Sequence, residues 1–412
     1  MVVFSYKQIK FHEREKVVRA YFLRSYYFEI PKEKLLNIGK FSVEDGKVEF
    51  PDVSEKKASK FNQILSDGFN NMINTITGKK TVYIHKNSGI PLIGSNVFGL
   101  VDRGSNLIEI KPMTGCNLNC VYCSICEGKE SNKEFDFVVE KDYMIDEIKK
   151  IIEFKGRDDI EAHIGTHGEP MLYLDIVELI RDLKKIKEVK VVSIDTNGML
   201  LTKESVDDMK RAGLTRFNLS IDAIDPIVAR KVANAYYDIK KVQKIVRYIA
   251  KTMDITITPL WVPELNDNEI EKLIKFAEEL KQIKYKYNLE QKSPIIGIQN
   301  FLEYKFGRKP AKQKSWDKFY TELENLEEKH CIKLIIKKED FNIKTAKALP
   351  KPFVKGEVID AIVLCHGKLK NEMIAAAKER SISVINCSKR IGQKVKIKIV
   401  RSKHNVYVGV EV

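Results

Sequence analysis

The chain has 412 residues, 43% of them hydrophobic and 31% charged, a composition that excludes a disordered protein and predicts two or three folded domains. No apolar run approaches the roughly 18 residues of a membrane-spanning helix, and the N-terminus has no signal-peptide pattern, so we expect a cytoplasmic protein without a membrane partner. The net charge of +15 favours a polyanionic partner such as nucleic acid, although a lysine-rich solvated surface is the alternative.

Residues 1–104 are predicted to form a small α+β domain. Apolar residues from Phe61 to Ile76 recur at 3.6-residue spacing, which predicts one amphipathic helix over 54–80. Short β-like runs flank this helix at 47–50 and 81–85. No residue in this part indicates what the domain binds.

Residues 105–340 alternate between apolar strands and capped helices. Strands are predicted at 107–112, 160–165, 190–194, 216–221, 255–262 and 294–299. Helices are predicted at 142–153, 172–185, 203–211 and 240–251, then after Asn266, and finally at 316–329. Asn266 and Glu269 have the spacing of a capping box for the fifth helix. Six strand–helix units predict parallel strands in an open, partial (β/α)6 barrel, an α/β fold.

A cysteine-rich loop directly follows the first of these strands. Cys116, Cys120 and Cys123 have a C-x3-C-x2-C spacing, with Tyr122 before the third cysteine. Three thiolates can hold three corners of a cubane iron–sulfur cluster and leave one iron free. Four of the seven cysteines lie between Cys116 and Cys126, which favours metal or redox chemistry over disulfides.

Polar loops also follow the other predicted strands. They contain Gly168-Glu169-Pro170, then Asp195-Thr196-Asn197-Gly198, then Ser220 and Asp222. In such barrels the chemistry lies at the C-terminal ends of the strands. The sequence therefore predicts that these loops and the cysteine loop face one site.

Residues 350–412 are predicted to form a small OB-type β-barrel after a linker rich in Pro and Lys. Five short strands are expected at 357–364, 371–377, 381–386, 393–401 and 406–412. Between 394 and 399, lysines alternate with Val and Ile, so one face of that strand is basic. A basic barrel face suits nucleic acid, but lysines also protect exposed edge strands, and both interpretations stay open here.

The middle of the chain resembles the radical S-adenosylmethionine (SAM) superfamily. The resemblance rests on the cysteine spacing with its preceding aromatic residue, on GEP after the second strand, on TNG at 196–198 and on FNLSIDAIDP at 217–226. It implies that Cys116, Cys120 and Cys123 bind a [4Fe-4S] cluster. It also implies that an electron, from a donor such as ferredoxin or flavodoxin, cleaves SAM to a 5′-deoxyadenosyl radical.

The same resemblance suggests which residues bind SAM. Tyr122 is expected near the adenine, and the backbone of Gly168, Glu169 and Pro170 near the methionyl amine. Candidates for the ribose and carboxylate are Asp195, Asn197, Ser220 and Asp222, and Gln299 is expected near the adenine.

Four further residues invite a functional interpretation. Cys126 as a fourth cluster ligand would block SAM binding, so we expect it to be a structural thiol. His167 stands where the superfamily usually has the first glycine of Gly-Gly-Glu-Pro. We expect it to hydrogen-bond its neighbours rather than act as an acid or base. A methyl-carrying thiol would be a role for Cys365 or Cys387, but the apolar context of Cys365 favours an inert core cysteine.

The C-terminal part is similar to TRAM domains of tRNA- and rRNA-modifying enzymes, through KGEV, VKIKI and the N-x-Y-x-G ending. Together with the charge, this predicts a radical SAM enzyme that modifies a nucleoside in RNA. The absence of cysteines in residues 1–115 argues against a methylthiotransferase with a second cluster. The alternatives are a peptide or small-metabolite substrate, or an Fe–S protein that binds RNA without catalysis.

Overall fold

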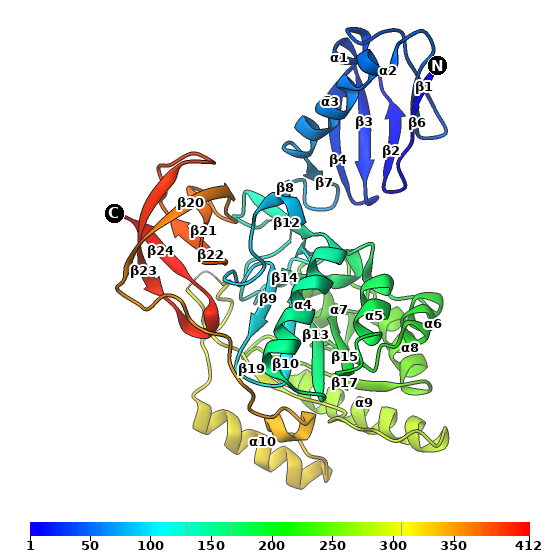
Figure 1. The fold of residues 1–412 in the computed structure, drawn as a ribbon. Coiled ribbons are helices and arrows are strands. Elements are labelled where there is room, and N and C mark those ends of the chain that lie inside the picture. The colour runs from blue at the N-terminus through cyan, green and yellow to red at the C-terminus, as the bar shows by residue number, and fades with distance from the viewer. Residues whose placement is uncertain (129, 166, 306) are drawn as a thin grey trace.

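The computed structural model of the chain describes residues 1–128, 130–165, 167–305 and 307–412. Figure 1 shows three parts: an N-terminal sheet with its helices, a central sheet surrounded by helices, and a small C-terminal barrel. Residues 9–31 of the N-terminal sheet stand apart from the barrel (Figure 1), whereas Phe135, at the other edge of this sheet, stacks on His366 of the barrel with ring centroids 4.5 Å apart. Among the described residues, no helix combines the length and apolarity needed to cross a bilayer.

The N-terminal sheet has six strands. In spatial order they are β12 (Phe135–Val139), β8 (Lys80–Ile84), β7 (Ile73–Asn74), β4 (Tyr26–Pro31), β3 (Val17–Phe22) and β2 (Ile9–Glu13). Alternate residues such as Phe11 and Phe28 are buried beneath α3 (Lys60–Phe69), where Phe61 packs against Phe11. The intervening residues of β2, β3 and β4 lie on the opposite face of the sheet and are partly or fully exposed.

Smaller elements complete this part: β1 (Val2–Phe4), β5 (Ser42–Glu44), β6 (Lys47–Phe50), α1 (Lys32–Leu36), α2 (Glu55–Ala58) and the short turn η1 (Lys86–Ser88). The strands predicted at 47–50 and 81–85 are confirmed as β6 and β8. The single helix predicted over 54–80 is wrong beyond Phe69, because Ile73 and Asn74 pair with β4 instead. Sheet pairing outweighs the helical periodicity there.

The central sheet confirms the repeated parallel units. Its order is β17 (Asp254–Ile257), β16 (Arg216–Leu219), β15 (Val189–Thr196), β13 (Ile160–Ile164), β10 (Leu107–Lys111) and β9 (Gly99–Asp102). Neighbouring strands from β10 to β17 are parallel, and β9 is antiparallel to β10. The sixth predicted strand is reduced to one bridge between Ile257 and Ile296 and a parallel pair, β18 (Leu260–Trp261) with β19 (Gln299–Asn300).

The helices of the central part are α4 (Lys141–Lys155), α5 (Ile176–Lys184), α6 (Lys203–Ala212), α7 (Pro226–Ala233), α8 (Ile239–Ala250), α9 (Asp267–Lys286) and α10 (Trp316–His330), with short turns η2 (Pro170–Leu172) and η3 (Lys338–Phe341). The predicted capping box of α9 is wrong. The Asn266 side chain instead donates to the carbonyls of Asp222 and Leu260, both at 2.8 Å, and Glu269 accepts from the amide of Ile224 at 2.7 Å. Both residues thereby fasten the loop after β16.

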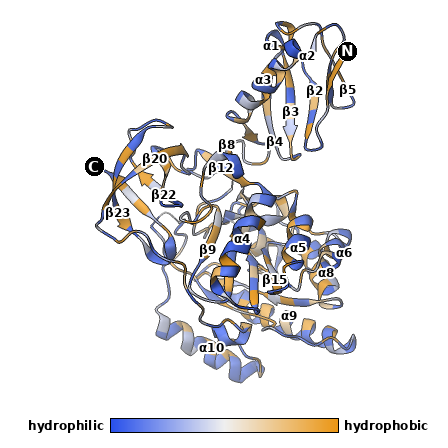
Figure 2. Cartoon of the chain, viewed as in Figure 1, coloured by the Kyte–Doolittle hydropathy of each residue, from blue (hydrophilic) through white to orange (hydrophobic). Residues whose placement is uncertain are grey.

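The C-terminal barrel is closed by five strands, as predicted. They are β20 (Val358–His366), β21 (Glu372–Ala377), β22 (Arg380–Ile385), β24 (Val408–Glu411) and β23 (Lys394–Arg401), with η4 (Lys403–Asn405) before β24. Val363, Ile397 and Tyr407 form part of its own buried core. Figure 2 shows hydrophobic and hydrophilic residues alternating along these strands. The α/β class with a partial barrel and a C-terminal β-barrel is thus confirmed.

Backbone contacts fix the barrel to the central part. The amide of Ser381 donates to Ile93 at 2.8 Å, and the amide of Tyr407 donates to Gly94 at 2.9 Å. A Cβ on Gly94 would lie 2.1 Å from the carbonyl oxygen of Ser381, so only glycine permits this approach. The barrel therefore contacts the central part directly through its backbone.

Candidate active site

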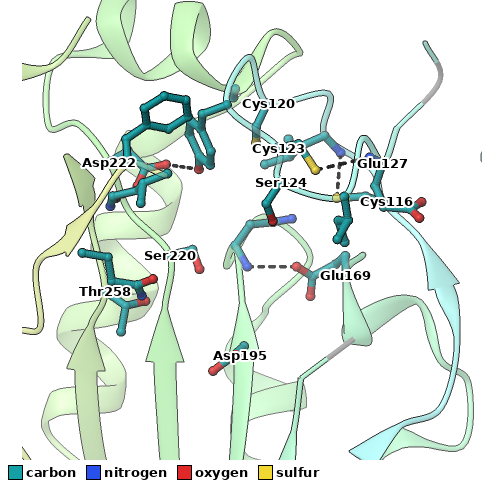
Figure 3. Close-up of a pocket in the computed structure, with 18 of the residues that line it drawn as sticks. Cys116, Cys120, Cys123, Ser124, Glu127, Glu169, Asp195, Ser220, Asp222 and Thr258 are labelled. Atoms are coloured by element: carbon teal, nitrogen blue, oxygen red, sulfur yellow. Dashed lines mark hydrogen bonds between the residues drawn. The ribbon is translucent and has the colours of Figure 1, made fainter. Parts of the chain in front are cut away.

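The cysteine loop forms one wall of a cavity at the C-terminal ends of the central strands. β10 and the short β11 (Thr114–Gly115) carry it, and β11 pairs with β14 (His167–Gly168). The cavity has a volume of about 350 Å³, and Figure 3 shows Cys116, Cys120 and Cys123 around it. The sequence-predicted cysteines therefore come together on one wall.

The donor set fits an iron–sulfur cluster. The sulfur of Cys116 accepts the amide of Leu118 at 3.4 Å, and that of Cys123 accepts the amide of Glu127 at 3.2 Å. Burial raises the pKa of the Cys120 thiol to about 12, so cluster binding must displace its proton. In the described part of the chain, no group of three His, Cys, Asp or Glu side chains is placed to hold a single metal ion. A cubane cluster has a different requirement, because each thiolate binds a different iron.

Glu169 organises the floor of the cavity. Its carboxylate accepts hydrogen bonds from Thr196 Oγ1 at 2.6 Å and from the amides of Asn197 and Met171 at 2.9 and 3.0 Å. Burial raises the pKa of Glu169 to about 7 despite these donors. The GEP and TNG motifs are thus bonded to each other, and the Asn197 side chain donates to Asn117 at 2.9 Å in the cysteine loop.

Tyr122 and Asp222 connect the cysteine loop to the loop after β16. The Tyr122 hydroxyl donates to one oxygen of Asp222, and the amide of Leu260 donates to the other at 2.8 Å. Burial raises the pKa of Asp222 to about 6. Ser220 lies beside them on the same wall.

The structure brings most of the predicted cofactor-binding residues into this cavity. Its lining includes Cys116, Cys120, Tyr122, Cys123, Gly168, Glu169, Asp195, Asn197, Ser220, Asp222 and Gln299. Pro170 is buried at the start of η2 and is not among the described lining residues. Asp195 accepts a hydrogen bond from Asn218 at 2.8 Å and lies 3.2 Å from His163.

Gly168 is required by the backbone at the motif. Its φ of +145° is unfavourable for other residues, and a Cβ there would lie 1.9 Å from the carbonyl oxygen of Gly115. This close approach lets β14 pair with β11 directly beneath the cysteine loop.

Sequence reasoning missed Arg308, which holds the cysteine loop from outside. Its guanidinium donates to the carbonyl of Cys120 at 2.7 Å, to that of Glu127 at 3.1 Å and to the side chain of Asn119. Its own amide donates to Cys123 at 3.0 Å. Nothing in the local sequence could have indicated these contacts, because Arg308 comes from a loop far along the chain.

A buried charge cluster behind the loop was also missed. Glu127 pairs with Lys133, which lies 2.6 Å from Asp136, and Lys368 of the C-terminal barrel lies 2.8 Å from Glu127. The Lys368 ammonium also donates to the carbonyl of Ile125 at 2.8 Å. The barrel therefore contacts the cysteine loop directly.

The remaining singled-out residues lie elsewhere. Cys126 has a φ of +51° and is not among the described lining residues of the cavity. His167 is buried 3.4 Å from the Asn96 side chain, and burial lowers its pKa well below the usual range. Cys365 is buried in β20, and Cys387 is partly buried at the barrel.

Comparison with known proteins agrees with the site. The family described as the Radical SAM superfamily matches residues 110–277. The chain is 40% identical over 360 residues to "Uncharacterized protein MJ0103" of Methanocaldococcus jannaschii, covering 82% of each. It is 31% identical over 182 residues to the GTP 3′,8-cyclase of Listeria welshimeri, and the match spans 43% of this chain and about half, 52%, of the cyclase.

Among solved structures, the crystal structure of Streptococcus suis SuiB bound to S-adenosylmethionine matches with 14% identity and a TM-score of 0.41, over 80% of this chain and 72% of that one. A TM-score of this size is too low to bear on the fold or the substrate. The family match covers the cysteine loop and the GEP, TNG and SID motifs. The chain therefore belongs to the radical SAM superfamily, whose members use a [4Fe-4S] cluster and SAM.

Proposed function

We propose that this radical SAM enzyme modifies a nucleoside within RNA, in tRNA or rRNA, and that the C-terminal barrel holds RNA phosphates. The observation that carries the proposal is the basic face of β23. Lys394, Lys396 and Lys398 are exposed on it, whereas the intervening Val395 and Ile397 are buried. Regularly spaced cations on a small barrel suit a phosphate backbone.

The alternative explanation for these lysines, protection of an exposed edge, is weakened by the topology. β23 pairs with β20 on one side and with β24 on the other, so it has no free edge to protect. One acid, Asp360, lies opposite Lys396. Residues 350–412 nevertheless contain thirteen Lys and Arg against five Asp and Glu, a net charge of +8, which is over half of the total.

The position of the barrel supports the same proposal. Its Lys368 reaches the cysteine loop, so the barrel adjoins the part of the molecule that carries the cavity. The similarity to the TRAM domains of RNA-modifying enzymes adds to this. That relationship stays a prediction, because the closed five-stranded barrel alone does not establish it.

A second candidate is a free nucleotide as substrate. The match to GTP 3′,8-cyclase, an enzyme named for GTP, favours a nucleotide. In that case the barrel would serve as a cover of the site. Both candidates share a nucleoside as the reacting group.

When bound, the cluster and SAM supply a carbon-centred radical by reductive cleavage of the sulfonium. The chain's residues would hold and shield these groups: the three cysteines would hold the cluster, and Glu169 fixes the TNG loop in the same cavity. A low-potential electron donor such as ferredoxin or flavodoxin belongs to the proposal as a partner.

The proposal is tested by measuring RNA affinity as a function of salt. The triple variant K394A/K396A/K398A should bind bulk tRNA or rRNA more weakly, and its logarithmic salt slope should fall by about 2. The matched triple K275A/K281A/K286A, on the exposed side of α9, should keep the wild-type slope. The reconstituted wild type should release 5′-deoxyadenosine with dithionite and SAM, and Cys120→Ala should not.

Two outcomes would contradict the proposal. No RNA binding by the wild type at low salt would remove RNA as the substrate and favour the free nucleotide. An unchanged salt slope in the K394A/K396A/K398A variant would show that the basic face of β23 does not contact phosphates.

A further inference from the structure

The N-terminal sheet presents a regular array of rings and cations on its uncovered face. The strand register places Lys10 beside Tyr21, and Tyr21 beside Tyr27, in one row across β2, β3 and β4. The next row contains His12, Arg19 and Glu29. Because side chains alternate along strands, all six lie on the face opposite the core beneath α3.

The members of this array contact one another. The rings of Tyr21 and Tyr27 have centroids 5.9 Å apart, and the His12 ring meets Tyr21 edge to face at 5.4 Å. The Arg19 guanidinium lies over the Tyr27 ring at 4.4 Å and pairs with Glu29 at 2.6 Å. The ring contacts of both tyrosines in the described part of the chain stay within this array.

The composition of the face indicates its ligand. The centre of a protein–protein interface is depleted in charged residues, whereas here Lys10, Arg19 and Glu29 stand directly beside the two phenol rings. Residues 1–35 contain eight Lys and Arg against four Glu, a net charge of +4, and no Asp. Aromatic rings among cations on an open sheet suit unpaired nucleobases, which stack on the rings while the phosphates meet the charges.

We infer that this face, defined by Lys10, His12, Arg19, Tyr21 and Tyr27, binds a single-stranded segment of the RNA substrate by base stacking. The inference rests on the proposed function for the identity of the ligand and adds a second contact surface to it. The enzyme would hold its substrate at two places, by phosphates at the C-terminal barrel and by bases at the N-terminal sheet. The central cavity belongs to a third part of the fold (Figure 1).

The test uses the full chain and a short fluorescein-labelled oligoadenylate. The variant Y21L/Y27L keeps apolar side chains on the face and removes the stacking surfaces, and we expect affinity to fall by about tenfold or more without a change in salt slope. The matched control Y285L/Y287L replaces two exposed tyrosines at the end of α9 and should bind like the wild type. Inorganic polyphosphate should compete poorly for this base-dependent part of the affinity.

A second measurement does not depend on the stability of a variant. Photo-crosslinking of the wild type with RNA containing 4-thiouridine should label the peptides of β2, β3 and β4. Equal affinity of Y21L/Y27L and the wild type, or crosslinks confined to the other two parts, would overturn the inference and leave the proposed function standing. Absence of RNA binding by the wild type would overturn both, and a pull-down of a protein partner by this face would overturn the inference alone.

Discussion

Glu169 is a buried carboxyl group at the junction of two motifs, and its ionisation is coupled to folding. All three of its hydrogen-bond partners donate to the carboxylate, yet burial raises its pKa from 4.5 to about 7. The folded chain therefore holds a proton on Glu169 at pH values where the unfolded chain has released it.

The free energy of unfolding should accordingly fall as the pH rises from about 4.5 to about 7. The contribution of Glu169 is about 3 kcal/mol over that range. In Glu169→Gln this part of the slope should disappear, which urea denaturation of the metal-free chain at several pH values measures. The pKa of Asp222 is raised to about 6, so its ionisation also lowers the free energy of unfolding as the pH rises. Glu169→Gln should therefore keep a smaller dependence of the free energy of unfolding on pH.

The control for this prediction is Glu178→Gln on the exposed side of α5, where the carboxylate pairs with Arg181 on the same helix. The loss of hydrogen bonds in Glu169→Gln shifts stability at every pH, so the slope and not the absolute value is diagnostic. Identical slopes in the wild type and Glu169→Gln would contradict the raised pKa.

At the residue scale, the sequence predicted which residues come together at the cavity wherever a local pattern places them at the end of a strand. The three cysteines, Glu169, Asn197 and Asp222 each follow a strand, and parallel strands bring such positions to one edge. Arg308 and Lys368 were not predictable, because each acts through contacts with a loop nearly 200 residues or more away. No local pattern carries that information.

At the element scale, the pairing of β11 with β14 depends on one glycine. Gly168→Ala places a methyl group 1.9 Å from the carbonyl oxygen of Gly115 and should separate the two strands. We expect Gly168→Ala to have a lower melting temperature than the wild type and to lose the cluster more readily. The loss of the cluster can be measured by its visible absorption during treatment with a chelator.

Gly392→Ala is the matched control for backbone strain. Gly392 also has a positive φ, of +86°, but a Cβ there would meet no atom within 4 Å. The difference between the two variants isolates the steric clash from the conformational cost. Equal losses of stability would mean that strain alone, and not the close approach of β14 to β11, explains the glycine.

The elements that sequence reasoning missed have identifiable physical causes. The hairpin of β3 and β4 turns at Leu23 and Arg24, both with positive φ, although such turns usually contain Gly or Asn. The end of α3 at Phe69 is set by pairing of Ile73 with Tyr27. In both places tertiary contacts outweigh the local preference.

At the scale of the whole molecule, Lys368 connects the C-terminal barrel to the cysteine loop. Lys368→Ala leaves the carbonyl of Ile125 without this donor and leaves Glu127 with Lys133 as its remaining cation. We expect the free energy of unfolding to fall by about 1–3 kcal/mol. Hydrogen exchange measured by mass spectrometry should become faster in residues 120–128.

Lys370→Ala serves as the comparison, because Lys370 lies in the same turn and is exposed. It should leave exchange in the cysteine loop unchanged. Similar exchange in both variants would show that the barrel does not stabilise the loop through Lys368.

The strand β12 has a consequence for the order in which the chain folds. It pairs in parallel with β8, joining Lys80 to Phe135 and Ile84 to Val139, so the N-terminal sheet lacks a strand until synthesis has passed Val139. All the cysteines of the loop leave the ribosome before that strand does. Such a non-local pairing forms slowly because a long loop must close first. The sheet can therefore close only after the whole cysteine loop has been synthesised, because this loop lies in the segment that joins β8 to β12.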